Sequence, residues 1–191
     1  MRKLSLLAVV LMLGLVSGAA FAQTAAPVGD GSVYFVTYFA NNVAGAPDAT
    51  VRVINDGSSA LSLWAAYYVF DDSQELTECC ACYVSPDGIN SESVKNNLTA
   101  TPLTGKVPSR GVIKVISSTI PVAYAVAPKS GLHGFATHVQ STGAATYAIT
   151  EDALADANLV AGEQALLENL CYFSYLLSGA PCSCTPEDHD F

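Results

Sequence analysis

Apolar and polar residues alternate along much of the chain, and this period of two is the pattern of β-strands. The alternating runs are short, and turn residues such as Gly, Pro, Asp and Ser separate them. They predict strands at residues 32–42, 50–54, 61–70, 78–84, 111–118, 121–128 and 132–140, with a further one at 145–150. The sequence therefore predicts a mainly β fold, an immunoglobulin-like β-sandwich of about seven strands.

The first of these runs, "SVYFVTYFANN" at residues 32–42, is apolar in both of its alternation classes. A strand with two apolar faces is expected to be covered on both sides. The simpler interpretation is that it forms the first strand of its own sheet. The alternative is that it completes the sheet of a neighbouring copy by strand addition, which would give self-association through the N-terminal strand.

Asp56 and Gly57 stand between two alternating runs, which is a strong signal for a β-hairpin that joins strand 50–54 to strand 61–70. The longer strand is apolar on both sides. One predicted face carries Leu61, Leu63, Ala65, Tyr67 and Val69, and the other carries Trp64, Tyr68 and Phe70. A short helix is expected in the polar segment that follows, at residues 91–98.

The period changes near the C-terminus, where residues 160–178 predict a helix. Leu166, Leu170, Phe173 and Leu177 recur at steps of four, three and four, so they share one helix face. Gly179 and Pro181 follow as stop signals. We expect this helix to pack against the sheet and to carry Cys171 inward.

The N-terminal residues 1–22 have the order of a secretory signal peptide: two basic residues, a short apolar stretch and the A-x-A sequence that ends at Ala22. The expected mature chain, residues 23–191, is a single domain with a C-terminal helix and a cysteine-rich tail. Cleavage removes Arg2 and Lys3 and leaves 6 basic residues against 17 acidic ones, a net charge of −11. A surface this acidic repels nucleic acid and anionic lipid, so binding to either is not expected. No later segment is long and apolar enough to span a bilayer, so an integral membrane protein is not expected.

Six cysteines form two distant groups, with Cys79, Cys80 and Cys82 in the first and Cys171, Cys182 and Cys184 in the second. Export to an oxidising compartment and an even count favour a disulfide framework. Two alternatives remain open, since Cys79-x-x-Cys82 has the spacing of a zinc ligand pair and of a redox site. The partner motif, Cys182-x-Cys184, lacks the zinc spacing.

Alternation within strand 78–84 suggests how the cysteines pair. Adjacent cysteines are hard to join, because a disulfide needs α-carbons about 5.5 Å apart and one trans peptide step spans about 3.8 Å. Cys80 and Cys82 share one face of the strand, whereas Cys79 points to the other. We therefore expect Cys80 and Cys82 to pair with Cys182 and Cys184, and Cys79 to pair with Cys171 on the helix.

The segment "VFDDSQELTECCACYVSPDGINSESVKNNLT", followed by "FATHVQ", a helix that carries a cysteine, and "GAPCSC", resembles a family of small secreted bacterial proteins with no characterised function. The resemblance covers most of the mature chain and rests on the Cys-Cys-x-Cys and terminal Cys-x-Cys motifs. It implies an extracytoplasmic location and a shared disulfide core, and it supplies no catalytic residues.

The sequence offers few residues for catalysis. His133 and His138 are five positions apart, so in one strand they face opposite sides and cannot act as a pair. His189 lies in an acidic tail. The carboxylate pairs Asp71/Asp72 and Glu151/Asp152 lie at expected strand ends, where solvated caps are common. No nucleotide-binding, nucleophile-elbow or metalloprotease motif is present, so neither a cofactor nor a metal is expected.

Taken together, these features predict a secreted or periplasmic, non-enzymatic structural or binding protein whose partner the sequence does not identify. One version of this prediction is an adhesin-like or self-assembling subunit. One alternative is a metal-binding or thiol-redox protein that uses the cysteine clusters. The other is an extracytoplasmic hydrolase.

Overall fold

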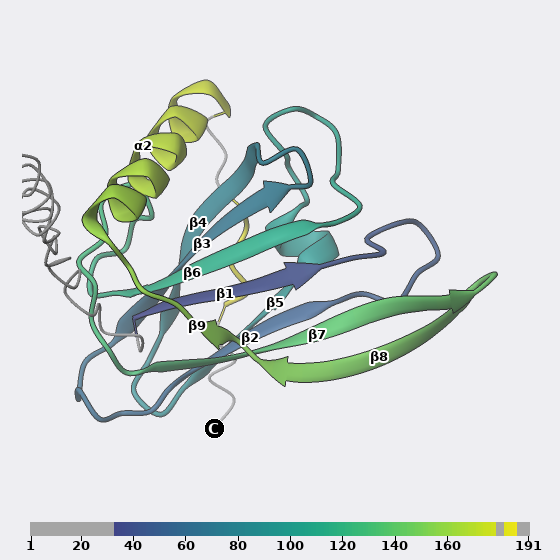
Figure 1. The fold of residues 1–191 in the computed structure, drawn as a ribbon. Helices are drawn as coiled ribbons and strands as arrows, with labels where there is room; N and C mark the ends of the chain where they lie inside the picture. Colours follow the sequence, from purple (N-terminus) through teal and green to yellow (C-terminus); the bar gives the residue numbers. More distant parts are fainter. Residues whose placement is uncertain (1–32, 179–181, 187–191) are drawn as a thin grey trace, which may run out of the picture.

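Two antiparallel β-sheets form the body of the protein in the computed structural model, which describes residues 33–178 and 182–186 (Figure 1). The five-stranded sheet has the order β4-β3-β6-β1-β9, and the four-stranded sheet has the order β5-β2-β7-β8. The expected signal peptide at residues 1–22, Gly179, Pro181 and His189 lie outside the described residues.

The described residues contain nine strands, one π-helical turn and a long C-terminal helix. Their bounds are β1 Tyr34–Phe39, β2 Thr50–Asn55, β3 Leu63–Asp71, β4 Leu76–Val84, β5 Ile89–Ser93, η1 Val94–Leu98, β6 Gly111–Ser118, β7 Leu132–Gly143, β8 Thr146–Ala153, β9 Ala155–Asp156 and α2 Ala161–Ser178. The mainly β prediction is confirmed. The expected count of about seven strands is too low, because β9 was not anticipated and residues 89–93 form a strand instead of the start of a helix.

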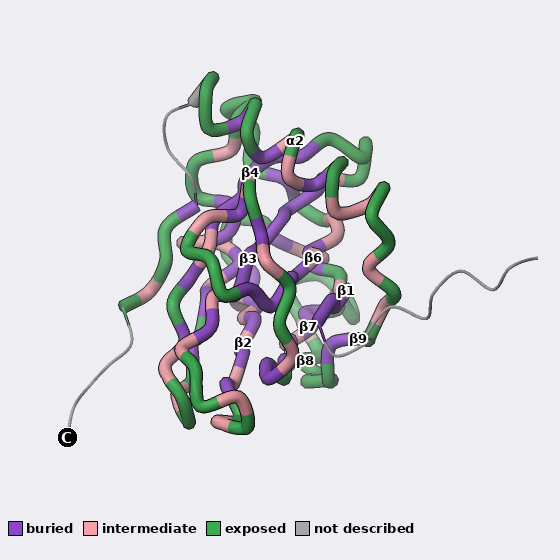
Figure 2. The backbone as a smooth tube through the Cα atoms, turned by 90° about the vertical axis from the view of Figure 1, so that its left-hand side faces the viewer, coloured by how far each residue is buried: buried purple, intermediate pink, exposed green. Residues whose placement is uncertain are grey.

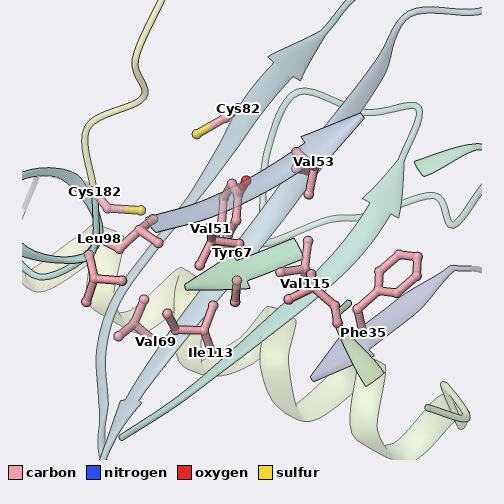
Figure 3. Close-up of a cluster of buried hydrophobic side chains, with 14 of the residues drawn as sticks. Phe35, Val51, Val53, Tyr67, Val69, Cys82, Leu98, Ile113, Val115 and Cys182 are labelled. Carbon is pink, nitrogen blue, oxygen red and sulfur yellow. The ribbon is translucent and has the colours of Figure 1, made fainter. Parts of the chain in front are cut away.

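The sheets pack face to face across a shared apolar core (Figure 3). Alternation in the interior strand β3 sends Leu63, Ala65, Tyr67 and Val69 into this core, as predicted. Tyr68 and Phe70 point the other way, into a second buried cluster that includes Leu167 and Cys171 of α2. The five-stranded sheet is therefore covered on both faces, by the other sheet and by the helix.

Strand β1 is an interior strand of its own chain's sheet. It pairs with β6 along its whole length and with β9 at Phe35 and Val36. Phe35 and Phe39 lie in the core between the sheets, whereas Tyr38 is 48% exposed. This pairing favours the interpretation that the N-terminal strand belongs to the sheet of its own chain. The second face of the strand is only partly covered, because Tyr38 is exposed.

The predicted hairpin at Asp56 and Gly57 is wrong. β2 pairs with β5 and β7, and β3 pairs with β4 and β6, so residues 56–62 cross from one sheet to the other. The Asn55 side chain fixes this crossing by donating to the carbonyl oxygens of Leu61 and Val84, at 2.9 and 3.1 Å. Leu61, expected within the strand, lies in the crossing loop and is 47% exposed.

The strand predicted at residues 121–128 is also wrong. This segment is irregular and makes one isolated bridge, between Ser118 and Pro128. Pro121 and Pro128 have no backbone N–H to give to a sheet. Other groups satisfy the backbone: the Tyr68 hydroxyl donates to the carbonyl of Ala123 at 2.6 Å, and Glu168 accepts from the N–H of Val126 at 2.9 Å. The segment thus packs beneath α2 as a loop.

Helix α2 forms where it was predicted but buries a different face. Leu167, Cys171 and Ser174 are buried, whereas Leu166, Phe173 and Leu177 are at least half exposed. Figure 2 shows buried and exposed stretches alternating along α2. The helix has apolar residues nearly all round, so periodicity alone did not distinguish its inner face from its outer face. No helix among the described residues is long and apolar enough to cross a membrane.

Gly111, the first residue of β6, lies where neighbouring strands leave no room for a side chain. A β-carbon there would lie 1.9 Å from the carbonyl oxygen of Phe70 and 2.9 Å from the ring of Phe39. We expect Gly111→Ala to lower the free energy of unfolding by about 2 kcal/mol, because the strands must separate to admit the methyl group. Chemical denaturation would measure this. Gly162→Ala is the control, since its β-carbon would meet nothing within 4 Å, and a loss as large there would contradict the steric explanation.

Candidate functional site

Strand β4 presents its three cysteines on two faces. Cys80 and Cys82 belong to the core between the sheets, and Cys79 belongs to the cluster beneath α2. The alternation of the strand produces this division, as the sequence predicted.

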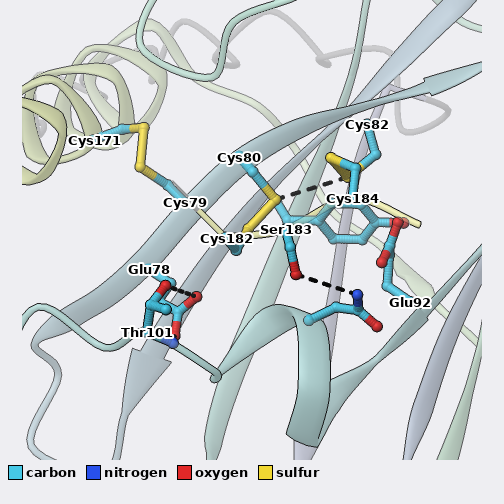
Figure 4. The surroundings of a disulfide bond; sticks show 12 residues. Glu78, Cys79, Cys80, Cys82, Glu92, Thr101, Cys171, Cys182, Ser183 and Cys184 are labelled. Carbon is cyan, nitrogen blue, oxygen red and sulfur yellow. Dashed lines mark hydrogen bonds between the residues drawn. A yellow bond between two sulfur atoms is a disulfide. The ribbon is translucent and has the colours of Figure 1, made fainter. Parts of the chain in front are cut away.

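All six cysteines form disulfides, and the described residues include no free cysteine (Figure 4). Cys79 pairs with Cys171 (Cα–Cα 5.8 Å), Cys80 with Cys182 (5.2 Å) and Cys82 with Cys184 (5.3 Å). This is the pairing that the alternation of β4 suggested. The bridges join residues 92 or 102 positions apart, so they tie the helix and tail to the sheet.

The sulfurs of the last two bridges lie together. Sγ of Cys80 is 3.7 Å from Sγ of Cys82, and the sulfurs of Cys80, Cys82 and Cys184 all lie within 4.8 Å of one another. Thiolates so placed would have the spacing of a metal site. In a disulfide each sulfur is bonded to a second sulfur and carries neither a proton nor a negative charge. The cluster therefore offers no thiolate to a metal ion.

Hydrogen bonds hold the tail beside the last bridge. The N–H of Thr185 donates to the Glu92 carboxylate at 2.9 and 3.1 Å, and its hydroxyl donates at 3.0 Å. Asn90 donates to Glu92 at 2.9 Å and to the carbonyl of Thr185 at 3.3 Å, while Tyr67 donates to Asn90 at 3.2 Å. Burial raises the pKa of Glu92, against the opposing effect of these hydrogen bonds.

The tail closes one open side of the sandwich. β4 is the last strand of one sheet and β5 the last strand of the other. Residues 182–185 bond covalently to β4 and by hydrogen bonds to β5. We call this assembly, made of the three disulfides, Asn90, Glu92 and Thr185, the C-terminal clasp.

A second buried carboxylate, Glu78, lies next to the cysteines. It accepts from the N–H of Thr101 at 2.6 Å and faces the Thr101 hydroxyl at 3.5 Å (Figure 4). Burial raises the pKa of Glu78 to about 7, although the Thr101 hydrogen bonds oppose the shift. Sequence reasoning missed both glutamates. The signal for Glu92 is the inverted pattern of β5, where Ile89 is exposed while Asn90 and Glu92 are buried.

A cavity of about 220 Å³ lies between α2, residues 121–124 and the clasp. Its walls include all three disulfides, Val122 and Ser174, with Tyr124 and Tyr175 at a ring distance of 5.5 Å. A wider cavity of about 400 Å³ opens on the other side of α2, beside Phe70, Lys114 and Leu166. Both cavities therefore border the helix.

Polar contacts fix the N-terminal end of α2 on the sheet. Glu163 accepts from Lys114 at 2.5 Å and from the Tyr34 hydroxyl at 2.9 Å. Burial raises the pKa of Glu163, but the Lys114 and Tyr34 hydrogen bonds outweigh it and leave the pKa lowered. Burial also raises the pKa of the Tyr34 phenol. The helix is thus anchored near its start by Glu163 and near its middle by Cys171.

The two histidines among the described residues, His133 and His138, lie apart, and neither lines the two cavities. His133 is exposed and donates to Asp56 at 3.0 Å. Hydrogen bonds from Ser58, and then from His133, lower the pKa of Asp56 to about 2. His138 is buried and stacks on Tyr38 with ring centroids 4.1 Å apart. The two side chains therefore face opposite sides, as their spacing predicted.

The carboxylate pairs have structural partners. Asp71 caps its turn by accepting from the N–H groups of Ser73 and Glu75. Asp72 pairs with Arg110 at 2.7 Å, and Glu151 pairs with Arg52 at 2.5 Å. Asp152 lies 4.0 Å from Nε2 of His138 on the neighbouring strand. Each of the four carboxylates therefore has a partner at a turn or between strands.

No protein-family model matches the chain, and neither a curated protein nor a solved structure is detectably similar to it. The resemblance to small secreted bacterial proteins therefore stays a prediction that rests on the cysteine motifs.

Proposed function

We propose that this is a secreted, non-enzymatic structural or binding protein of the cell surface or extracellular space, and that it binds through the outer face of α2. We define the outer face as the six large exposed side chains Leu166, Tyr172, Phe173, Tyr175, Leu176 and Leu177. The size of this apolar surface is the observation that carries the proposal.

The exposed fractions on the outer face are high, at 75% for Leu177, 59% for Phe173 and 58% for Leu176. The six side chains together expose roughly 600 Å². The largest apolar patch on a soluble monomer is typically about 300–600 Å² and often has a function. A surface of this size on one helix is typical of a docking site.

The C-terminal clasp supports this role because it holds the helix rigidly. Cys171 bonds to β4, Leu167 is fully buried, and Glu163 and Glu168 accept hydrogen bonds from the body of the protein. A binding surface on a preorganised element loses little conformational entropy when it binds. The clasp would therefore maintain the outer face in one conformation.

Three disulfides suggest an oxidising, extracytoplasmic environment. We propose that the protein is released or held at the cell surface. We also propose that its two-sheet body belongs to the immunoglobulin-like class and serves as a scaffold. The packing of the two sheets against each other supports the role as a scaffold. The separate surroundings of His133, which is exposed beside Asp56, and His138, which is buried, support the non-enzymatic class.

Fractionation of producing cells tests the proposal. Free thiols are first blocked with an alkylating reagent, and the protein is then followed by immunoblot and by mass spectrometry without reduction. We expect an extracytoplasmic protein that begins near Gln23 and has three disulfides. A cytoplasmic protein with alkylated cysteines would contradict the proposal.

The sulfur cluster of Cys80, Cys82 and Cys184 supports one second candidate, a metal-binding or thiol-redox protein. That function needs the two C-x-C pairs in reduced form. The same mass spectra decide it, because a metal protein would keep stoichiometric metal and release free thiols when stripped. We expect all six sulfurs of the native protein to be bonded in disulfides, with none alkylated, and we expect no uptake of added Zn²⁺.

A further inference from the structure

We propose that the bridges Cys80–Cys182 and Cys82–Cys184 form a thiol-exchange site, at which one dithiol reductant opens both bridges and leaves a new bond between Cys80 and Cys82. The reaction would detach the tail from β4. This inference goes beyond the proposed function, because it does not involve the outer face of α2. Three observations carry it: the contact between sulfurs of the two bridges, the difference in exposure among them, and the C-x-C spacing on β4 and on the tail.

A protein reductant can reach these bridges at one sulfur. Cys80, Cys82 and Cys182 are buried, whereas Cys184 is at least partly exposed. The cavity beside α2 borders the bridges as well, but a dithiol protein is too large to enter about 220 Å³. A thiolate that bonds to one sulfur of a disulfide displaces the other. Attack on Cys184 therefore forms a mixed disulfide there and releases Cys82 as a thiolate.

The Cys82 thiolate has its next target beside it. Sγ of Cys82 lies 3.7 Å from Sγ of Cys80, which is close to van der Waals contact (Figure 4). When Cys82 attacks, the Cys80–Cys82 bond forms, the Cys80–Cys182 bond breaks, and the electron pair leaves on Cys182. A charge on Cys82 would stay inside the core, whereas Cys182 on the freed tail can move into water. Because a buried charge is unfavourable, this second exchange is favoured.

The second thiol of the reductant completes the reaction. It attacks the mixed disulfide, so that the reductant becomes a disulfide and Cys184 leaves as a thiolate. Both tail thiolates, on Cys182 and Cys184, then take a proton. Two bridges are thus replaced by one new bond and two thiols, and two electrons and two protons have passed from the dithiol to the protein. A single reduction therefore removes both covalent ties of the tail.

The new bond suits the geometry of β4. Cys80 and Cys82 share one face of an extended strand, so their α-carbons are about 6.6 Å apart, within the range of about 4.4–6.8 Å that disulfides span. Their sulfurs must approach from 3.7 Å to about 2.05 Å. Cys79 points to the other face, into the cluster beneath α2, so its bond to Cys171 lies outside the exchange. The helix would stay attached when the tail is detached.

Treatment of the native protein with one equivalent of reduced thioredoxin tests the proposal. The reaction is stopped at intervals with an alkylating reagent, and peptides from a digest at acid pH are identified by mass spectrometry without further reduction. We expect alkylated Cys182 and Cys184, and a β4 peptide that contains the Cys80–Cys82 bond and is still joined to α2 through Cys79. Alkylation of the third bridge should be at least about tenfold slower, because both of its cysteines are buried.

Two variants check the second exchange without any reductant. Cys184→Ser leaves a thiol on Cys82 beside Cys80, so we expect the Cys80–Cys82 bond and a free thiol on Cys182. Cys171→Ser is the matched control, because it leaves its thiol on the opposite face of β4, and both tail bridges should stay intact. Circular dichroism shows whether each variant is folded.

Three results would overturn the proposal. The first is a native protein that reduced thioredoxin leaves unchanged or reduces equally at all three bridges. The second is alkylation of Cys82 and Cys184 with the Cys80–Cys182 bond intact, which would mean that one bridge is reduced without exchange. The third is a folded Cys184→Ser variant that keeps the Cys80–Cys182 bond. In each case an extracytoplasmic protein with three native disulfides would leave the proposed function standing.

Discussion

Replacing all six cysteines by alanine is expected to lower the free energy of unfolding by about 10 kcal/mol, whereas removing only the Cys82–Cys184 bridge should cost about 2 kcal/mol. The difference arises because the three bridges close almost the same loop. The first bridge to form constrains about 100 residues of the unfolded chain. Each further bridge then closes only a short segment, such as the one from Cys80 to Cys82 with Ala81 between them, and stabilises the fold by less.

Urea unfolding followed by circular dichroism would measure the loss for the single-bridge variant, and the circular dichroism spectrum without urea would show whether the cysteine-free chain is folded. A loss of about 10 kcal/mol is comparable to the whole stability of a domain, about 5–15 kcal/mol, so the cysteine-free chain should be largely unfolded. The matched variant replaces Cys79 and Cys171, which releases the helix but keeps the tail. If removing one tail bridge alone cost about 5 kcal/mol, the bridges would not share one loop.

The stability of the native protein is expected to fall as the pH rises from about 4.5 to about 7, and Glu78→Gln should remove much of this fall. The pKa of Glu78 is about 7 in the folded protein against 4.5 for an ordinary glutamate. The folded state thus binds more protons than the unfolded state between these values, and stability decreases with pH there. The full difference corresponds to at most about 3 kcal/mol.

Denaturation curves for the native protein and Glu78→Gln, taken at pH 5 and at pH 8, isolate this effect. The variant should gain about 2 kcal/mol relative to the native protein between the two values, since an amide keeps the Thr101 hydrogen bond without a charge. Glu75→Gln, on the exposed turn before β4, is the control and should show no such gain. A difference that stays constant with pH would mean that Glu78 titrates normally.

The parts of the fold that depend on local alternation were predictable. The side chains of β3 divide between the two cores as their parity required, and the same rule placed Cys79 opposite Cys80 and Cys82. An extended chain alternates its side chains whatever it packs against, so this inference needs no knowledge of the partner strand.

The predictions that failed depend on contacts between residues that are distant in the sequence. A turn forms from Gly57 to Ala60, but the side chain of Asn55 ties the segment to Leu61 and Val84, and the next strand joins the other sheet. Helix α2 offers apolar residues on both sides, and contacts with distant segments determine which side is buried: the bond from Cys171 to β4 and the hydrogen bonds of Glu163 and Glu168. Neither choice follows from the local pattern, because each is made by a contact with a distant strand.

The buried glutamates could not be recognised for a related reason. Glu78 and Glu92 look like ordinary polar residues in the sequence, and each becomes buried only when a later segment covers it. Thr101 covers Glu78 and Thr185 covers Glu92. Their raised pKa values are therefore properties of the assembled fold.

The long separation of the bridged cysteines also affects how the protein must be made. A chain that is exported from its N-terminus delivers Cys79, Cys80 and Cys82 to the oxidising compartment 92 to 102 residues ahead of their partners. Until translocation ends, the early thiols have only one another, so Cys80 and Cys82 are exposed to a premature bond. In the secreted protein that we propose, a bond between Cys80 and Cys82 would have to be opened by thiol exchange after the last residues arrive, a reaction that disulfide isomerases catalyse.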